Sequence, residues 1–247
     1  MYNMRKCILI VCVGIFLSFL ACTSQKQQNI NDVITLDSLK SIPLTIAIQT
    51  GKSFNNPSFA IWIEDMNEQI LSTIFVTKSV ATNYFGHAYS KNNVWLPDSG
   101  ISIRPATLPY WLHKQTGGNI TAVNLQNPIV PDALSGATPK GNVTIHSSIP
   151  ETFPNKIKVC LEINQAWDWN QFYTNSKYPN SFEYKTSAQP SVIYAVNVDV
   201  TSKNTIYFMN PIGHGHFAGE NGELYTDLRG HTSALQIVDF ISVTLKK

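Results

Sequence analysis

The sequence predicts a mainly β protein: an immunoglobulin-like β-sandwich that carries a long irregular excursion and one or two short helices. Two observations lead to this prediction. Short segments with apolar residues at every second position recur along the chain, which is typical of strands with one buried face. Helical spacing is scarce and the connections between the segments are long and polar, which favours a sandwich.

Eight segments alternate in this way or are rich in β-branched and aromatic residues between turn residues. They are residues 44–48, 59–63, 70–76, 143–145, 157–163, 192–200, 205–209 and 241–245. The sequence Asp-Met-Asn-Glu at 65–68 separates the second segment from the third. We therefore expect a hairpin with a four-residue turn at this point.

Two stretches are typical of short helices. Residues 110–115 follow Pro109, and residues 233–239 begin at a Thr-Ser pair in which Thr232 or Ser233 would be the cap. Residues 78–142 have weak periodicity and many turn residues. We expect this segment to be the excursion, packed on the sandwich.

The first 42 residues indicate export. Arg5 and Lys6 precede an apolar run at 7–20, which is too short to span a bilayer comfortably, so residues 1–21 are interpreted as a signal peptide. The sequence Phe-Leu-Ala-Cys at 19–22 resembles a bacterial lipobox, which would place a lipid anchor on Cys22. The alternative is an ordinary secretory signal with an incidental cysteine. Residues 22–42 are polar and are expected to be a tether, followed by a single domain at 43–247.

The charge of the chain indicates which partners to expect. The sequence has 18 Lys and Arg against 16 Asp and Glu, a net charge of +2. Removal of the signal peptide takes away two basic residues, which leaves the mature protein neutral. A neutral surface does not favour nucleic acid. We expect a cell-envelope lipoprotein on the periplasmic side, held to the membrane by Cys22, whose partners are other envelope proteins or a neutral small ligand.

Six short motifs occur in order along the mature chain. They are AIWIED at 60–65, RPATLPYW at 104–111, DALSGATP at 132–139, EINQAWDWN at 162–170, QPSVIY at 189–194 and GHGH at 213–216. Together they resemble the DUF2271 family of bacterial exported proteins, a family without an established function. The resemblance implies an extracytoplasmic β-rich protein and supplies no catalytic residues.

The third motif also resembles the flavin-attachment motif of periplasmic flavoproteins, in which a transferase links FMN to a threonine. Thr138 would be the acceptor, and Gly136 and Ala137 would leave room for the phosphate. Pro139 and Lys140 depart from that motif. The simpler interpretation, which we favour, is a structural turn.

His214 and His216 are a candidate metal pair. In an extended segment their imidazoles would project to one face, a spacing found in zinc sites, and Glu220, Glu223, Asp227 or His231 could add ligands. Two ligands do not make a site, and the neighbouring glycines predict a loop. We favour histidines that hydrogen-bond to the backbone.

Trp167 and Trp169 lie in the densest aromatic stretch, which continues through Phe172, Tyr173, Tyr178 and Tyr184. Exposed aromatic rings among Asn and Asp residues are typical of sugar-binding surfaces. Strand alternation places both tryptophans on one face, where burial in the core is the default that we favour.

Catalytic motifs are absent from the sequence: it contains no Gly-x-Ser-x-Gly, His-Glu-x-x-His, phosphate loop or dinucleotide fingerprint. Cys160, the single cysteine left after the anchor, is expected in a strand and partly buried. We expect a non-catalytic binding or accessory module. The alternative function is extracytoplasmic electron transfer with FMN on Thr138.

Overall fold

The computed structural model describes residues 31–34, 41–89, 94–119, 134–202 and 205–246. The predicted signal peptide at 1–21, the lipidation site Cys22 and most of the predicted tether lie outside these residues. Among the described residues, no helix is long and apolar enough to cross a membrane.

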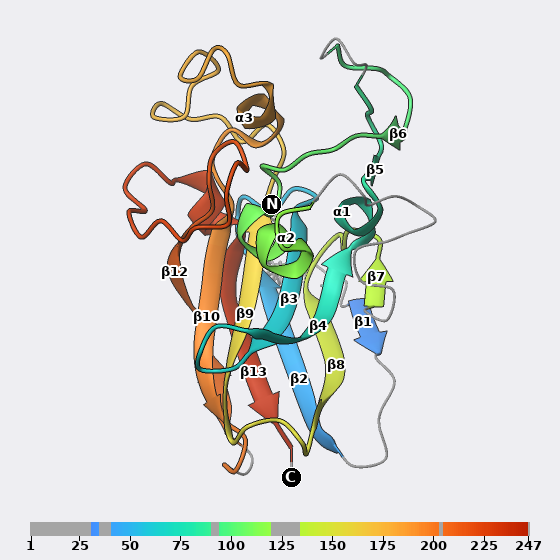
Figure 1. Cartoon of the computed structure of the whole chain (residues 1–247), viewed down its shortest axis with the longest axis vertical. Helices are drawn as coiled ribbons and strands as arrows, with labels where there is room; N and C mark the ends of the chain where they lie inside the picture. The colour runs from blue at the N-terminus through green and yellow to red at the C-terminus, as the bar shows by residue number, and fades with distance from the viewer. Residues whose placement is uncertain (1–30, 35–40, 90–93, 120–133, 203–204, 247) are drawn as a thin grey trace, which may run out of the picture.

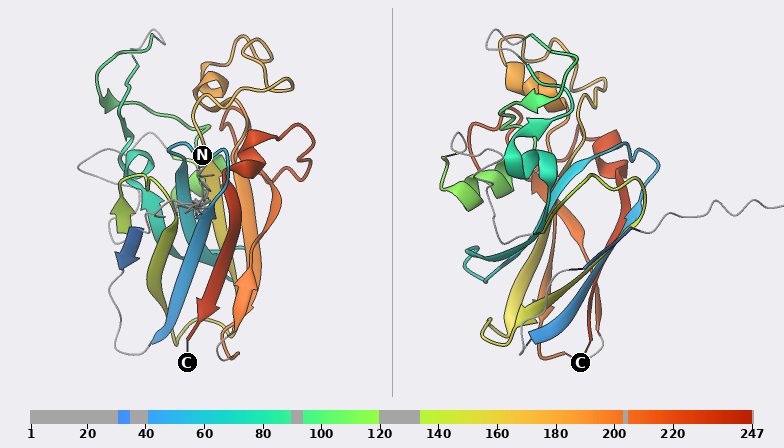
Figure 2. Two further views of the ribbon diagram at one scale, coloured as in Figure 1. Left: turned by 180° about the vertical axis from the view of Figure 1, so that it is seen from behind. Right: turned by 90° about the vertical axis from the view of Figure 1, so that its right-hand side faces the viewer.

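The fold is mainly β, and its two larger sheets pack face to face as a sandwich, as predicted (Figures 1 and 2). The immunoglobulin-like detail stays a prediction. In the described part of the chain, one sheet has five strands in the order β1 (Asn31–Ile34), β8 (Val143–Pro150), β2 (Ser41–Thr50), β13 (Val238–Leu245) and β11 (Ile206–Phe208). The other has six, in the order β12 (Asn210–His214), β10 (Val192–Asp199), β9 (Lys156–Asn164), β3 (Ser58–Glu64), β4 (Ile70–Thr77) and β7 (Leu134–Gly136). A short pair, β5 (Tyr84–Phe85) and β6 (Gly100–Ile101), lies apart from both.

The core between the sheets contains the alternating residues that the sequence predicted. Leu44, Ile46 and Ile48 of β2 are buried. On the facing sheet, the ring of Phe59 stacks on that of Phe75 with centroids 4.9 Å apart. The β3–β4 pair is the predicted hairpin, because the N–H of Asp65 donates to the carbonyl of Gln69 across the turn.

The outer face of the six-stranded sheet is buried as well. Helix α2 (Pro109–Thr116) lies across this face (Figure 2, right). Trp111 of α2 is in the same buried cluster as Trp62 of β3 and Cys160 of β9. The expectation that Cys160 is partly exposed is therefore wrong: its face of β9 is covered by a helix from a distant part of the chain.

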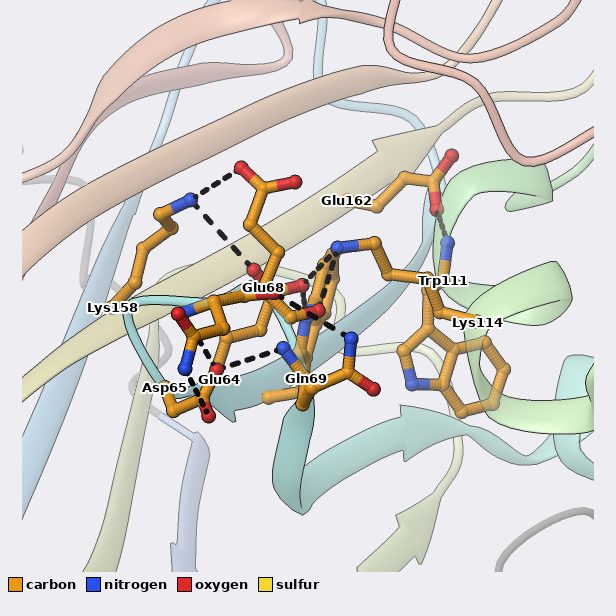
Figure 3. Close-up of polar contacts among 10 residues, drawn as sticks. Glu64, Asp65, Glu68, Gln69, Trp111, Lys114, Lys158 and Glu162 are labelled. Atoms are coloured by element: carbon orange, nitrogen blue, oxygen red, sulfur yellow. Dashed lines mark hydrogen bonds and ion pairs between the residues drawn. The ribbon is translucent and has the colours of Figure 1, made fainter. Parts of the chain in front are cut away.

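Two buried carboxylates lie beneath α2 (Figure 3). Glu162 accepts hydrogen bonds from the backbone N–H groups of Trp111 at 2.7 Å and Tyr110 at 3.2 Å, in the first turn of the helix. Glu64 forms an ion pair with Lys114 of α2, with 2.7 Å between Oε1 and Nζ. These contacts fix α2 to the sheet by its first turn and by its last.

The other helices differ in part from the prediction. Within the described residues there are three short α-helices, α1 (Lys78–Thr82), α2 and α3 (Phe182–Ser187). The predicted helix at 110–115 is α2. The predicted helix at 233–239 is a 3₁₀-helix, η2 (Ser233–Gln236), and β13 begins two residues after it.

The tether prediction needs one correction. β1 lies inside the segment 22–42 and pairs with β8 in parallel, and β2 begins at Ser41. This part of the segment therefore belongs to the sheet.

Loops from several parts of the chain gather at the end of the sandwich away from the C-terminus (Figure 1). They include the 165–191 connection between β9 and β10, which contains α3, and residues 215–232, which follow β12. These two connections form the site described next.

Candidate functional site

A pocket of about 520 Å³ opens between the 165–191 loop and the chain from β12 to residue 229. We call it the aromatic pocket, because five of its ten described lining residues carry phenyl or phenol rings. Its lining residues are Phe172, Tyr173, Lys177, Tyr178, His214, His216, Phe217, Tyr225, Asp227 and Arg229. Pockets of this size and composition are typical of small-molecule sites.

The rings of the pocket contact one another across the two loops. Tyr178 stacks on Phe217 with centroids 3.8 Å apart. Phe172 and Tyr173 meet edge to face at 5.0 Å. Lys177 places its ammonium 3.2 Å from the centroid of the Phe172 ring. The ammonium is therefore held over a ring face by a cation–π interaction at the edge of the cavity.

The two histidines of the pocket bond with the backbone, as the simpler interpretation of this motif predicted. His214 Nδ1 donates to the carbonyl of Gly215 at 2.7 Å, which leaves Nε2 of the neutral ring as an acceptor. His216 Nδ1 accepts from the N–H groups of Ala218 and Glu220, at 3.3 and 3.2 Å. In its neutral form His216 therefore carries its proton on Nε2. The pair therefore carries one acceptor, His214 Nε2, and one donor, His216 Nε2, which lies 4.0 Å from Glu220 Oε2.

Burial lowers the pKa of His214, so its ring is neutral at pH 7. The ring stacks on Tyr225 at 5.4 Å and lies 4.8 Å from the ring of His231. At the rim, Arg229 and Asp227 form an exposed ion pair, with 2.7 Å between Nη2 and Oδ2. The pocket thus combines neutral and apolar walls with charged groups near its mouth.

Asn170 connects the two walls of the pocket. Its Nδ2 donates to the carbonyl of Gly230 at 2.8 Å, and its Oδ1 accepts from the N–H groups of Phe172 and Tyr173 at 2.9 and 2.6 Å. The first bond joins the loops, and the other two turn the chain so that both rings follow directly.

A second set of bonds continues this connection toward the sheet. Gln189 Nε2 donates to the carbonyl of Asp168 at 2.9 Å, and its Oε1 accepts from the N–H of Thr232 at 2.7 Å. Ser233 Oγ donates to Asp168 Oδ1 at 2.5 Å. Because each loop is bonded to the other at several points, the pocket is preformed before a ligand binds.

The prediction that Trp167 and Trp169 pack in the core is wrong. Trp167 is 47 % exposed and Trp169 is 36 % exposed. Strand β9 ends at Asn164, and Trp167 adopts a φ of +59° in the turn that follows, so strand alternation no longer applies. Trp169 packs edge to face on Tyr184, while Trp167 borders a different cavity of about 320 Å³.

Thr138 lies away from the aromatic pocket. It is partly exposed and borders the same 320 Å³ cavity as Trp167, as well as a neighbouring one of about 210 Å³. Asp132, the first residue of the candidate flavin motif, lies outside the described residues. Flavin attachment at Thr138 stays a prediction, which the intact mass and the visible spectrum of the protein purified with its own transferase would test.

His214 and His216 both line the aromatic pocket. The portion of the chain that the structure describes contains no group of three or more His, Cys, Asp or Glu side chains arranged to hold a metal ion. The zinc site stays an untested prediction.

Lys177, Phe217 and Tyr225 were not predicted from the sequence as members of one site. Phe217 follows directly after the His-Gly-His motif, so a search for aromatic residues around that motif would have found it. Tyr225 and Lys177 carried no such signal, because their place depends on how the two loops meet.

Comparison with protein-family models, with curated proteins and with solved structures gives no match. The resemblance to the DUF2271 family stays a prediction, and the inference of function rests on the geometry of the site.

Proposed function

We propose that this protein is an exported, lipid-anchored binding module of the cell envelope, on the periplasmic side, and that its aromatic pocket binds a neutral carbohydrate without transforming it. One observation carries the proposal: five phenyl and phenol rings line one preformed cavity of about 520 Å³ that also holds a neutral His214. Ring faces pack against the C–H faces of sugars, and the polar groups between the rings bond to hydroxyls.

The charges of the pocket favour a neutral ligand over a cation. Lys177 already holds an ammonium over the Phe172 ring, and its charge would repel a second cation at the same ring. Hydroxyl oxygens, in contrast, accept hydrogen bonds from an ammonium, and hydroxyl hydrogens can bond to His214 Nε2. A polyhydroxylated ligand satisfies both groups.

The small number of carboxylates at the pocket favours binding over hydrolysis. Glycosidases of the usual type use two carboxyl groups on opposite sides of the scissile bond. Among the described lining residues Asp227 is the one carboxylate, and it is paired with Arg229. Glu162, a carboxylate of the neighbouring strand, is completely buried beneath α2 and out of reach of a sugar.

Titration calorimetry with neutral tetrasaccharides of glucose, xylose and N-acetylglucosamine tests the proposal. At least one should bind the wild type, and Phe172→Ala should weaken it at least tenfold, about 1.4 kcal/mol, because part of the aromatic wall of the pocket is lost. Phe208→Ala is the matched control: Phe208 is 58 % exposed against 55 % for Phe172, and it lies on β11, outside the pocket. Absence of binding by all three sugars, or equal weakening by both variants, would contradict the proposal.

The anchor is tested separately by fractionation of cells that express the full chain. We expect the wild type in the membrane fraction with the mass of a lipidated protein that begins at Cys22. Cys22→Ser should move the protein to the soluble periplasmic fraction. A Cys22→Ser protein that stays with the membrane would argue against lipidation at this residue.

A further inference from the structure

A second cavity, of about 320 Å³, lies on the side of the loop cluster formed by residues 85–107. Its lining includes Phe85, His87, Arg104, Thr138, Asn164 and Trp167, and it shares no described lining residue with the aromatic pocket. We call it the Arg104 cavity.

Among the residues that the structure describes, none neutralises the charge of Arg104. Its guanidinium lies over two aromatic rings, 4.1 Å from the centroid of Phe85 and 4.9 Å from that of Trp95. Its Nη2 donates to the carbonyl of His87. Its Nε is buried and has no hydrogen-bond partner, and no carboxylate pairs with the guanidinium among the residues that the structure describes.

Burial lowers the pKa of Arg104 to about 10, so the guanidinium stays charged at neutral pH. A buried polar group without a partner is destabilising, and more so when it is charged. Arg104 lines the cavity, and a charged guanidinium that has no carboxylate partner among the described residues is a candidate to pair with a ligand anion.

A second basic residue, Lys78, lies next to the Arg104 cavity. A smaller cavity of about 210 Å³ adjoins the first, because Ser79 and Thr138 line both, and it adds Lys78. Neither set of described lining residues contains Asp or Glu. The aromatic pocket differs in this respect, because Asp227 balances Arg229 there.

The Arg104 cavity also has a flat apolar wall. Trp167 is 47 % exposed and is held in place by an edge-to-face contact with Trp95 at 5.5 Å. The ring centroid of His87 lies 6.2 Å from that of Trp167. An exposed indole held by neighbouring rings provides a surface on which a planar group can stack.

We propose that the Arg104 cavity binds a small aromatic anion, whose carboxylate or phosphate pairs with Arg104 and whose ring stacks on Trp167. The hydroxyls of Ser79 and Thr138 lie in the same lining and can donate to the remaining anion oxygens. This site is separate from the carbohydrate pocket, and the failure of either proposal leaves the other intact.

Three probes that share a phenyl ring test the charge requirement: phenylacetate, its uncharged isostere phenylacetamide, and phenyl phosphate. Binding is measured by saturation-transfer NMR and calorimetry on the mature chain. At least one anion should bind at least tenfold more tightly than phenylacetamide, and the tighter of the two tells whether the site prefers carboxylate or phosphate. If phenylacetamide binds as well as both anions, or if no probe binds, the proposal is wrong.

Two variants test the place of binding. Arg104→Gln should abolish the preference for the anions over phenylacetamide. Trp167→Asn should weaken the anions and phenylacetamide alike by about tenfold. Asn tolerates the positive φ of this exposed position, so that variant should fold even if Arg104→Gln does not. Phe172→Ala, in the aromatic pocket, is the control and should leave anion binding unchanged. Anion binding that survives Trp167→Asn, or that Phe172→Ala removes, would overturn the assignment to this cavity.

Discussion

Asn170 donates a hydrogen bond from Nδ2 to the carbonyl oxygen of Gly230, with 2.8 Å between the two atoms, and so joins the two walls of the aromatic pocket. The same side chain uses its other end to shape the turn that presents Phe172 and Tyr173. One polar residue therefore both positions the rings and holds the opposite loop against them.

The two roles of Asn170 can be separated by substitution. Asn170→Asp keeps an oxygen for the N–H groups of Phe172 and Tyr173 but loses the donor to Gly230, whereas Asn170→Ala loses both. We expect Asn170→Ala to lower the free energy of unfolding by about 1–3 kcal/mol and Asn170→Asp by a smaller amount. Denaturant unfolding and hydrogen exchange measure these effects. Amides of residues 228–232 should exchange faster in both variants; unchanged protection there in Asn170→Asp would contradict the inter-loop role.

Gly230 should not tolerate a side chain, because the ring of Phe172 packs against it. A Cβ at Gly230 would lie 2.4 Å from Phe172 Cδ1, and the residue has a φ of +144°. Gly117→Ala is the control: Gly117 has a φ of +59°, and a Cβ there meets nothing within 4 Å. We expect Gly117→Ala to cost about 1 kcal/mol, from backbone strain alone. Gly230→Ala should cost about 1–3 kcal/mol more and shift the ring resonances of Phe172. Equal losses of stability with unchanged Phe172 resonances would count against this packing.

The ion pair beneath α2 should matter more than a surface pair, because Glu64 is completely buried. Lys114 lies 2.7 Å from Glu64 Oε1, whereas Lys158 lies 3.9 Å from Oε2 (Figure 3). Lys114→Met leaves the buried carboxylate with the indole N–H of Trp62, at 2.8 Å from Oε1, and with Lys158 as its one remaining described cation. We expect this variant to lower the free energy of unfolding by about 3 kcal/mol.

Lys158→Met is the control for Lys114→Met and should cost less, since its closer partner is the exposed Glu68 at 3.0 Å. Replacement of Glu64 by Gln in the Lys114→Met background should recover part of the loss, because no buried charge then remains unpaired. Equal costs for the two lysine variants in urea unfolding would argue against a special role of Lys114.

Glu162 should make the stability of the protein depend on pH. Burial raises the pKa of Glu162 to about 7 from its ordinary value of 4.5, although the Ser191 hydroxyl and the N–H groups of Trp111 and Tyr110 oppose the rise. Between these values the folded protein holds a proton that the unfolded chain has lost. The contribution of Glu162 is therefore fully present below about pH 4.5 and is lost as the pH rises through 7.

Glu162→Gln has the same shape but does not ionise, so its comparison with the wild type isolates this effect. The unfolding free energy of the wild type minus that of Glu162→Gln should fall by about 3 kcal/mol from pH 4 to pH 8. The subtraction is needed because burial also lowers the pKa of His231, to about 4. That shift makes the free energy of unfolding rise with pH, which opposes the effect of Glu162 over part of this range. A difference that stays constant with pH would show that Glu162 does not titrate as inferred.

Much of the sandwich could be predicted from the sequence. β2, β3 and the β3–β4 hairpin lie where alternation and the polar turn at 65–68 placed them. The sequence of such a strand indicates its buried face, because each buried residue is followed by one that faces the other way. β5, β6 and β7, with two or three residues each, were missed because they lie in the segment 78–142, whose weak periodicity predicted no strand.

Two errors share one cause. Alternation was extended past Asn164 to Trp167, where the chain had already left the sheet, and Cys160 was placed on an open face that α2 in fact covers. In both cases the pattern describes a strand correctly but contains no information about where the strand ends or what packs on its outer face.

The sequence by itself determined the elements: which segments are strands, where the first hairpin turns, and which stretch is rich in aromatic residues. Only the tertiary structure decided that Phe172 and Tyr225 line one pocket, and that Arg104 and Trp167 line another. The reason is physical. Backbone periodicity is a local property that can be recognised within a single segment. A pocket depends on how distant loops are bonded together, and in the aromatic pocket the bonds are those of Asn170, Gln189 and Ser233.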